Sequence, residues 1–166
     1  AVEEFQPTIL FDEGDLSVEG DSEIRSILNS GHTKSSAFVM RCVGDGHDIR
    51  HFSTWSPKVI AAIGSLASTL HDRSIHIRLQ RKKKIDMVKR VRSLDSSISA
   101  DLCEQLVRWA NDNLDELARS SPSLPPELHD RAQDNWEPLL SIADEAGSDW
   151  PDRARKAALE LSRGDL

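Results

Sequence analysis

With 166 residues, of which 38% are apolar and 30% charged, the chain can form one domain with a hydrophobic core or two small subdomains, and its composition excludes a disordered protein. No apolar run approaches the roughly 18 residues that cross a membrane, and the first 30 residues lack the pattern of a signal peptide. Two cysteines, Cys42 and Cys103, are too few and too far apart for a disulfide framework. We therefore expect a cytoplasmic protein without a membrane partner.

The first predicted element is a strand at residues 8–11, followed by the acidic residues Asp12, Glu13 and Asp15. A continuous apolar run is typical of a buried parallel strand, and acids after it would lie at the carboxyl edge of the sheet, where open α/β proteins bind ligands. The alternative is a core strand followed by an ordinary acidic turn. Because this strand lies so close to Ala1, we expect the stretch to continue a longer parent chain.

The rest of the first half is predicted to alternate helix and strand. A helix capped by Asp21 or Ser22 is expected to end near Gly31, and the turn signal at residues 44–46 predicts a hairpin. The further predicted elements are strands at 37–43, 49–54, 58–63 and 74–79, and a short helical or turn segment at 66–72.

The second half is predicted to be entirely helical. Four helices are expected, at residues 84–94, from Ser99 or Asp101 to about 117, at 130–146 and at 152–162. Residues 120–126 form a linker-like break, and Pro138 indicates a kink or an early end of the third helix. We expect the tryptophans of this half to anchor a core rather than to stack on bases.

Positive charge is concentrated between residues 73 and 92, although the net charge of the chain is −7. This window holds nine basic residues, and its one acid is Asp86. Such a segment in an acidic protein points to an anionic partner such as a nucleotide or a nucleic acid. Of the nucleic acids, we expect DNA. The alternative is a solvated helix face. The residues expected to contact phosphates are Arg81, Lys82, Lys83, Lys84, Lys89 and Arg90.

A zinc site is conceivable at Cys42, His47 and His51, which lie in and around the predicted hairpin. A structural zinc site takes four ligands, usually with a close cysteine pair. Three candidates do not meet this requirement, so we interpret the histidines as ordinary loop residues.

Five short motifs support a family resemblance. They are Ile-Leu-Asn-Ser-Gly-His at 27–32, Arg-Cys-Val-Gly-Asp at 41–45, Phe-Ser-Thr-Trp at 52–55, Leu-His-Asp-Arg-Ser-Ile at 70–75 and Asp-Arg-Ala-Gln-Asp-Asn-Trp at 130–136. They resemble a bacterial domain family of unknown function found in helicase- or primase-like proteins of phages and mobile elements. The order of the predicted elements resembles the second half of an AAA+ ATPase core followed by its helical lid.

The resemblance implies an α/β fold: a partial P-loop (AAA+-like) sheet of about three to five strands in residues 1–80, then an all-α lid-like domain in residues 81–166. It also implies ATP and Mg²⁺ as cofactors, with Asp12 in the cofactor site as the metal-holding residue and Glu13 as the general base.

Three further roles follow from the same resemblance. Ser65 would be the first polar sensor, and Arg131 the second sensor in the lid; an exposed helix arginine is the alternative for Arg131. Arg73 would be the arginine finger, which stabilises charge on phosphoryl oxygens and acts on the nucleotide of a neighbouring subunit in a homo-oligomer.

One departure from the pattern is decisive for activity: the chain contains no G-x-x-x-x-G-K-[ST] loop to cradle phosphates. We therefore expect ATP hydrolysis and helicase-like action on nucleic acid only from a longer parent, in phage or mobile-element replication, and no activity from this stretch alone. The main alternative is a non-catalytic helical module that binds a protein or DNA. A metal-dependent nuclease using Asp12, Glu13 and Asp15 lacks a further acidic or histidine signature beside them.

Overall fold

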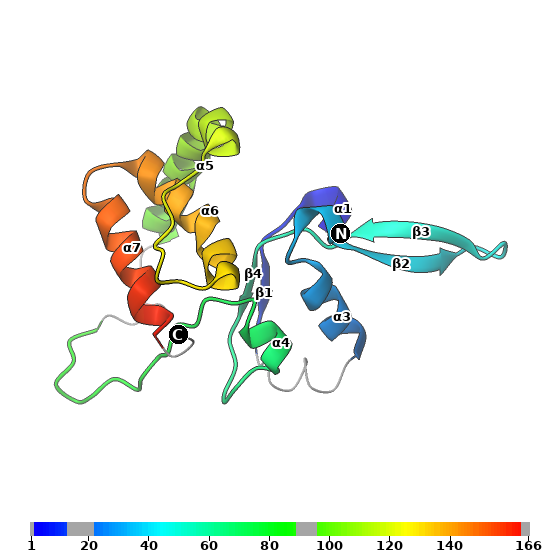
Figure 1. The fold of residues 1–166 in the computed structure, drawn as a ribbon, viewed down its shortest axis with the longest axis horizontal. Coiled ribbons are helices and arrows are strands. Elements are labelled where there is room, and N and C mark those ends of the chain that lie inside the picture. Colours follow the sequence, from blue (N-terminus) through cyan, green and yellow to red (C-terminus); the bar gives the residue numbers. More distant parts are fainter. Residues whose placement is uncertain (1, 13–21, 89–95, 164–166) are drawn as a thin grey trace. The chain divides into compact units, whose positions relative to one another are not determined.

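The computed structural model describes residues 2–12, 22–88 and 96–163, and the chain divides into two compact units (Figure 1). The first unit spans Ala1–Ser74 and the second Ile75–Leu166. This division falls between Ser74 and Ile75, whereas the sequence placed a domain boundary after residue 80.

The first unit contains two small sheets and short helices. Strands β1 (Ile9–Phe11) and β4 (Lys58–Ile60) pair in parallel, and β2 (Phe38–Val43) and β3 (Asp48–Ser53) form an antiparallel hairpin. The other elements are α1 (Val2–Phe5), α3 (Ser22–Ser30), the 3₁₀ turn η1 (Lys34–Ser36) and α4 (Ser68–His71).

The parallel pair packs on the small apolar core of the first unit. Leu28 of α3 and Leu70 of α4 are buried there, and Phe11 and Ile60, the last residues of β1 and β4, pack against them. On the opposite face of the pair, Leu10 is 74% exposed. The strand predicted at 8–11 therefore forms, but it is covered on one face instead of two.

The hairpin confirms the turn signal at residues 44–46. Val43 pairs with Asp48 across the turn, where Gly44 (φ +69°) and His47 (φ +54°) adopt the left-handed conformation that glycine tolerates without strain. On one face of the ribbon, the rings of Phe38 and His51 stack with their centroids 4.7 Å apart. The ribbon extends away from α3 in Figure 1.

The strand predicted at residues 74–79 is absent, because this segment is described without a strand or helix. Ile75 packs against the apolar core of the second unit, while Ile77 and Leu79 are 70% and 90% exposed. Alternating apolar residues make a strand only when a neighbouring strand supplies hydrogen bonds, and no described strand pairs with this segment.

The helix predicted at 84–94 is also wrong over residues 84–88, which are not helical, while 89–94 lie outside the described residues. In place of a helix, the Asp86 carboxylate accepts a hydrogen bond from the backbone N–H of Lys83 (2.6 Å), and the Asp86 N–H donates to the Lys83 carbonyl. A local side-chain bond of this kind competes with helix formation, and so does the repulsion between Arg81 and Lys84 three residues apart.

The second unit is helical, as expected, with α5 (Ser96–Arg119), α6 (Asp130–Ala146) and α7 (Trp150–Leu161). Helix α6 has the predicted bounds: His129 caps its start, and Gly147 (φ +66°) follows its end. Pro138 lies inside α6 without ending it. None of the helices among the described residues combines the length and the apolar character needed to cross a membrane.

The core of the second unit lies between α6 and α7. Its buried members include Leu140, which is 0% exposed, and Trp136, which is 6% exposed. The prediction that tryptophans anchor this core is right for Trp136 and wrong for Trp150, which is 50% exposed and lies under the guanidinium of Arg153. Trp150 is the first residue of α7, whereas Trp136 lies within α6 on its buried face.

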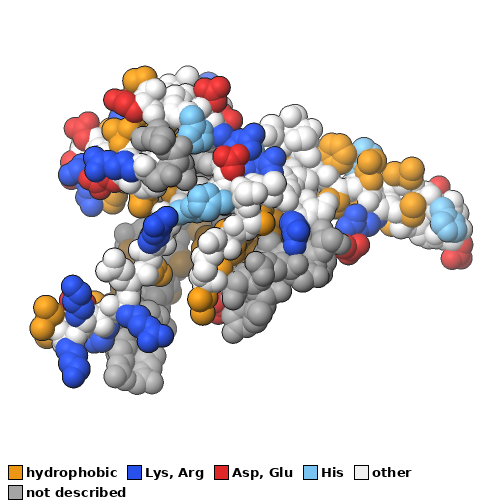
Figure 2. Space-filling view, turned by 60° about the horizontal axis from the view of Figure 1, so that its bottom comes forward, with side chains coloured by type: hydrophobic (Ala, Val, Ile, Leu, Met, Phe, Trp, Pro, Cys, Tyr) orange, Lys and Arg blue, Asp and Glu red, His pale blue; other side chains and the backbone are white. Residues whose placement is uncertain are grey.

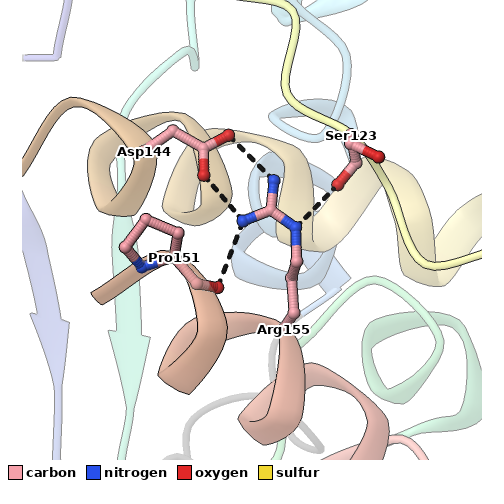
Figure 3. Close-up of polar contacts among 4 residues, drawn as sticks. All are labelled: Ser123, Asp144, Pro151 and Arg155. Carbon is pink, nitrogen blue, oxygen red and sulfur yellow. Dashed lines mark hydrogen bonds and ion pairs between the residues drawn. The ribbon is translucent and has the colours of Figure 1, made fainter. Parts of the chain in front are cut away.

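A guanidinium joins the segments around this core (Figure 3). Arg155 donates through Nη1 to Asp144 Oδ1 (2.6 Å) and through Nη2 to Asp144 Oδ2 (2.9 Å). Its Nε donates to the carbonyl of Ser123, and Nη1 donates also to the carbonyl of Pro151. The Arg155 hydrogen bonds hold the pKa of the Asp144 carboxyl below its ordinary value.

Candidate functional site

The carboxyl edge of the parallel pair carries the first predicted site residue. Phe11 ends β1 opposite Ile60, the last residue of β4, and the N–H of Ala61 donates to the Phe11 carbonyl (2.8 Å). Asp12 follows directly and is exposed. The strand register therefore puts Asp12 where the sequence predicted it, just past a strand end. Glu13 and Asp15 lie outside the described residues.

The strand end predicted just before Ser65 is wrong. Strand β4 ends at Ile60 instead of Ile63, so Ser65 lies five residues beyond the strand in an exposed loop. The preceding Gly64 has φ +94°. Alanines, Ala61 and Ala62, follow the strand directly, and they offer no polar side chain at the sheet edge.

Arg73 follows the short helix α4 and is partly buried. Its Nη1 donates to Asn29 Oδ1 of α3 at 3.0 Å and to the Thr69 carbonyl at 3.4 Å. Both acceptors are neutral, and no carboxylate in the described part of the chain forms an ion pair with Arg73. The guanidinium is thus tethered by two neutral oxygens.

Asn29 is a residue that the sequence reasoning missed as part of the site. It lies next to the buried Leu28, and Leu28 and Leu70 share the core that fixes α3 against α4. The available signal was its place in the motif at 27–32. No spacing rule links it to a residue 44 positions away.

The neighbouring Gly31 was read as the residue that ends the helix, but its surroundings show a second constraint. A Cβ at this position would meet the Lys58 ammonium and approach the Thr54 carbonyl to 2.7 Å. Lys58 Nζ donates to the carbonyls of Thr54 and Ser56, both at 3.0 Å, and burial lowers the pKa of Lys58.

Arg131 lies in the second unit, unlike Asp12 and Arg73. It is the second residue of α6 and is exposed. A cation in the first turn of a helix is disfavoured by the helix dipole.

The basic segment, residues 78–88, is exposed and contains a turn at residues 84–85 but no helix or strand. Among the residues that the structure describes, no acid forms an ion pair with Arg78, Arg81, Lys82, Lys83 or Lys84. Figure 2 shows Lys and Arg side chains in blue on several sides of this segment, at the lower left. Lys89 and Arg90 lie outside the described residues. Cations on an exposed segment can contact the phosphates of a nucleic acid.

No group of three possible metal ligands gathers in residues 2–12, 22–88 and 96–163. The carboxylate of Asp12 is a chemically suitable oxygen ligand for Mg²⁺. In the hairpin, the His47 ring contacts the Asp45 carbonyl (3.1 Å), and the His51 ring stacks on Phe38.

Comparison with known proteins places the second unit in a family. Residues 78–165 match the family described as "Protein of unknown function (DUF3631)". A 60-residue stretch is 48% identical to a protein of Saccharopolyspora erythraea named "Uncharacterized 28.9 kDa protein in xis 5'region". That stretch covers 36% of this chain and 22% of the relative, about a fifth of its length. No solved structure matches the chain.

The family match contains the basic segment, α5, α6, α7 and the motif at 130–136. The other four motifs lie before residue 78. The resemblance to a domain family of unknown function is confirmed, whereas the AAA+ assignment stays a prediction. Because the family match covers more than half of the residues of this chain, the chain belongs to the family of proteins of unknown function DUF3631.

Proposed function

We propose that this chain is the C-terminal part of an AAA+-like ATPase that acts on nucleic acid in phage or mobile-element replication. The observation that carries the proposal is the parallel pairing of β1 with β4, which puts Asp12 at a carboxyl edge. Ligands of open α/β folds bind at that edge. A strand ending in an acid is also the arrangement by which P-loop ATPases hold Mg²⁺.

The residues divide the chemistry of phosphoryl transfer between them. Asp12 would hold Mg²⁺ through an oxygen ligand, and Glu13 would orient the attacking water and accept its proton. Arg73 would stabilise charge on the transferred phosphoryl group. Bound ATP·Mg²⁺ supplies the phosphoryl group and neutralises part of its charge.

The fit to ATP is incomplete within these 166 residues. Asp12 and Arg73 suit a metal and a phosphate, but no G-x-x-x-x-G-K-[ST] loop is present to hold the phosphates. The proposal therefore concerns the natural-length protein that contains this chain. The mobile-element setting rests on the family resemblance, and the name of the related protein, in a xis 5′ region, agrees with it.

The test is steady-state ATP hydrolysis by the natural-length protein. Glu13→Gln should abolish turnover and leave nucleotide binding intact, because it removes the base and keeps the side-chain volume. Unchanged turnover, or no ATP binding by the unsubstituted protein, would contradict the ATPase proposal.

A second candidate function is a non-catalytic module that binds a protein partner. Helix α5 favours it, because Ile98, Leu102, Leu106 and Leu114 are each more than half exposed along one 24-residue helix. Exposed apolar stripes of this kind often mark interaction surfaces. Under this alternative, Glu13→Gln would change nothing measurable.

A further inference from the structure

We propose that Asn29 is a positioning residue for Arg73: it fixes the guanidinium through a neutral acceptor and leaves one edge of it open to the oxygens of a phosphoryl group. This inference rests on the function proposed above, and it adds a residue that the resemblance does not assign. Its basis is the 3.0 Å hydrogen bond from Arg73 Nη1 to Asn29 Oδ1.

The bond joins two segments that each contribute a buried leucine to the same small core. Asn29 follows Leu28 in α3, and Arg73 comes three residues after Leu70 of α4; Leu28 and Leu70 are 5% and 4% exposed in one core. The backbone at each end of the bond is therefore fixed by packing. A long arginine side chain that is tied at its tip loses most of its rotamer freedom in advance, which lowers the entropic cost of aligning the guanidinium with the transition state.

The hydrogen bonds of Arg73 determine which side of its guanidinium can bind a ligand. Nη1 is occupied by Asn29 Oδ1 and the Thr69 carbonyl, whereas Nε and Nη2 have no partner among the described residues. The Nε–H and one Nη2–H point the same way and form the side-on fork that binds two oxygens of a carboxylate or phosphate. Tethering Nη1 leaves this fork available.

The neutrality of the acceptor matters as much as its position. An aspartate at position 29 would make a similar hydrogen bond, but its charge would offset that of Arg73 and compete with an incoming phosphoryl group. Asparagine supplies the tether without that competition. Positioning and charge can therefore be separated by substitution at one residue.

The experiment measures kcat and KM for ATP in the natural-length protein, with folding followed by circular dichroism. Arg73→Ala should lower kcat by about 10³-fold, the lower range for an arginine finger. Arg73→Lys should be nearly as damaging, because one ammonium cannot both hold Asn29 and present a fork. Asn29→Ala should lower kcat by about 10- to 100-fold with little change in KM.

Asn29→Asp is the decisive variant, because it keeps the hydrogen bond and the fold. We expect its kcat to fall at least about tenfold, since the new carboxylate neutralises the guanidinium; a purely structural tether predicts full activity. Asn113→Ala is the matched control: Asn113 also lies on a helix and donates to the Trp109 carbonyl (2.7 Å), but in the second unit. Its kcat should be unchanged.

The possible failures are distinguishable. If Arg73→Ala retains its kcat, the proposed role of Arg73 itself is wrong. If Arg73→Ala is inactive while Asn29→Ala and Asn29→Asp turn over normally, the function stands and the inference about Asn29 is overturned. Full activity of Asn29→Asp alone would overturn the charge argument. A loss in Asn29→Ala through misfolding is recognised by circular dichroism, and Asn29→Asp then decides.

Discussion

Arg155 links three segments of the helical unit, because one guanidinium binds Asp144 near the end of α6, Ser123 in the preceding loop and Pro151 in its own helix. Both side chains of the ion pair are largely removed from solvent, with 25% and 33% exposed. Asp144→Asn should therefore lower the free energy of unfolding by about 1–3 kcal/mol, as measured by chemical denaturation. The exposed pair Arg153–Asp149 is the control, and Asp149→Asn should change the free energy of unfolding by less than about 0.5 kcal/mol.

The same pair gives a pH dependence with a definite sign. The pKa of Asp144 is lowered in the folded state, so its contribution is fully present above the unfolded pKa and is lost as pH falls through the folded one. Between pH 7 and pH 3, the unsubstituted protein should lose more stability than Asp144→Asn, and the difference should develop below about pH 4. Parallel pH profiles would contradict this assignment.

Gly31 is constrained by space and not by backbone conformation. A methyl group there meets the Lys58 ammonium and the Thr54 carbonyl, and the carbonyl belongs to a backbone that cannot rotate away. Gly31→Ala should lower the stability of the first unit by about 1–3 kcal/mol. Gly46→Ala is the matched control, since its nearest neighbour would lie at an ordinary 3.7 Å. Equal thermal midpoints for the two variants would refute the steric argument.

The sequence identified Gly31 as a helix end but not its contact with Lys58, and Asn29 shows the same limit. Periodicity and capping residues report on neighbours within a few positions. The Asn29–Arg73 bond depends on how two helices pack, and no local pattern encodes that distance. Asp12 was placed correctly because its position follows from a strand end alone.

At the level of elements, α6 depends on a buried stripe. Leu140 is fully buried between α6 and α7, and its neighbour Leu139 is 45% exposed. Leu140→Ala should cost about 2–5 kcal/mol of stability, whereas Leu139→Ala should cost less than about 1 kcal/mol. Urea denaturation of the two variants checks this difference. A similar loss in both would mean that the helix packs by another face.

An element was predictable from the sequence where the interactions that form it are local. The bounds of α6 were predictable because an amphipathic period and a terminal glycine are local signals. The hairpin was predictable because residues 44–46 are a strong turn signal. The strand predicted at residues 74–79 is absent because a strand needs a pairing partner, which the pattern does not reveal. The helix predicted at residues 84–88 is absent because like charges and the Asp86 carboxylate oppose it.

At the level of the whole molecule, the basic segment is the feature most directly open to test. Replacing Lys82, Lys83 and Lys84 together by alanine should weaken DNA binding for all sequences alike. It should also reduce the slope of log K against log salt by about three, because each lysine displaces about one counterion. Fluorescence anisotropy over a range of salt concentrations measures both.

The control variant removes the same number of positive charges from a different part of the chain. Arg108, Arg119 and Lys156 are exposed cations that each pair with an acid on the same helix. Their triple alanine variant should bind DNA as the unsubstituted protein does. Equal weakening by the two triple variants would show that net charge, and not the basic segment, governs binding.

Helix α5 has one further consequence, for the rate of hydrogen exchange along its length. Trp109, Asn113 and Leu117 are partly buried, whereas Ile98, Leu102 and Leu106 on the same stripe are mostly exposed. The first three turns therefore bury little apolar surface, and helix propensity by itself is marginal for so short a segment. Their amide protons should exchange with deuterium far faster than those after Trp109, so that α5 opens from its N-terminal end while α6 and α7 remain protected.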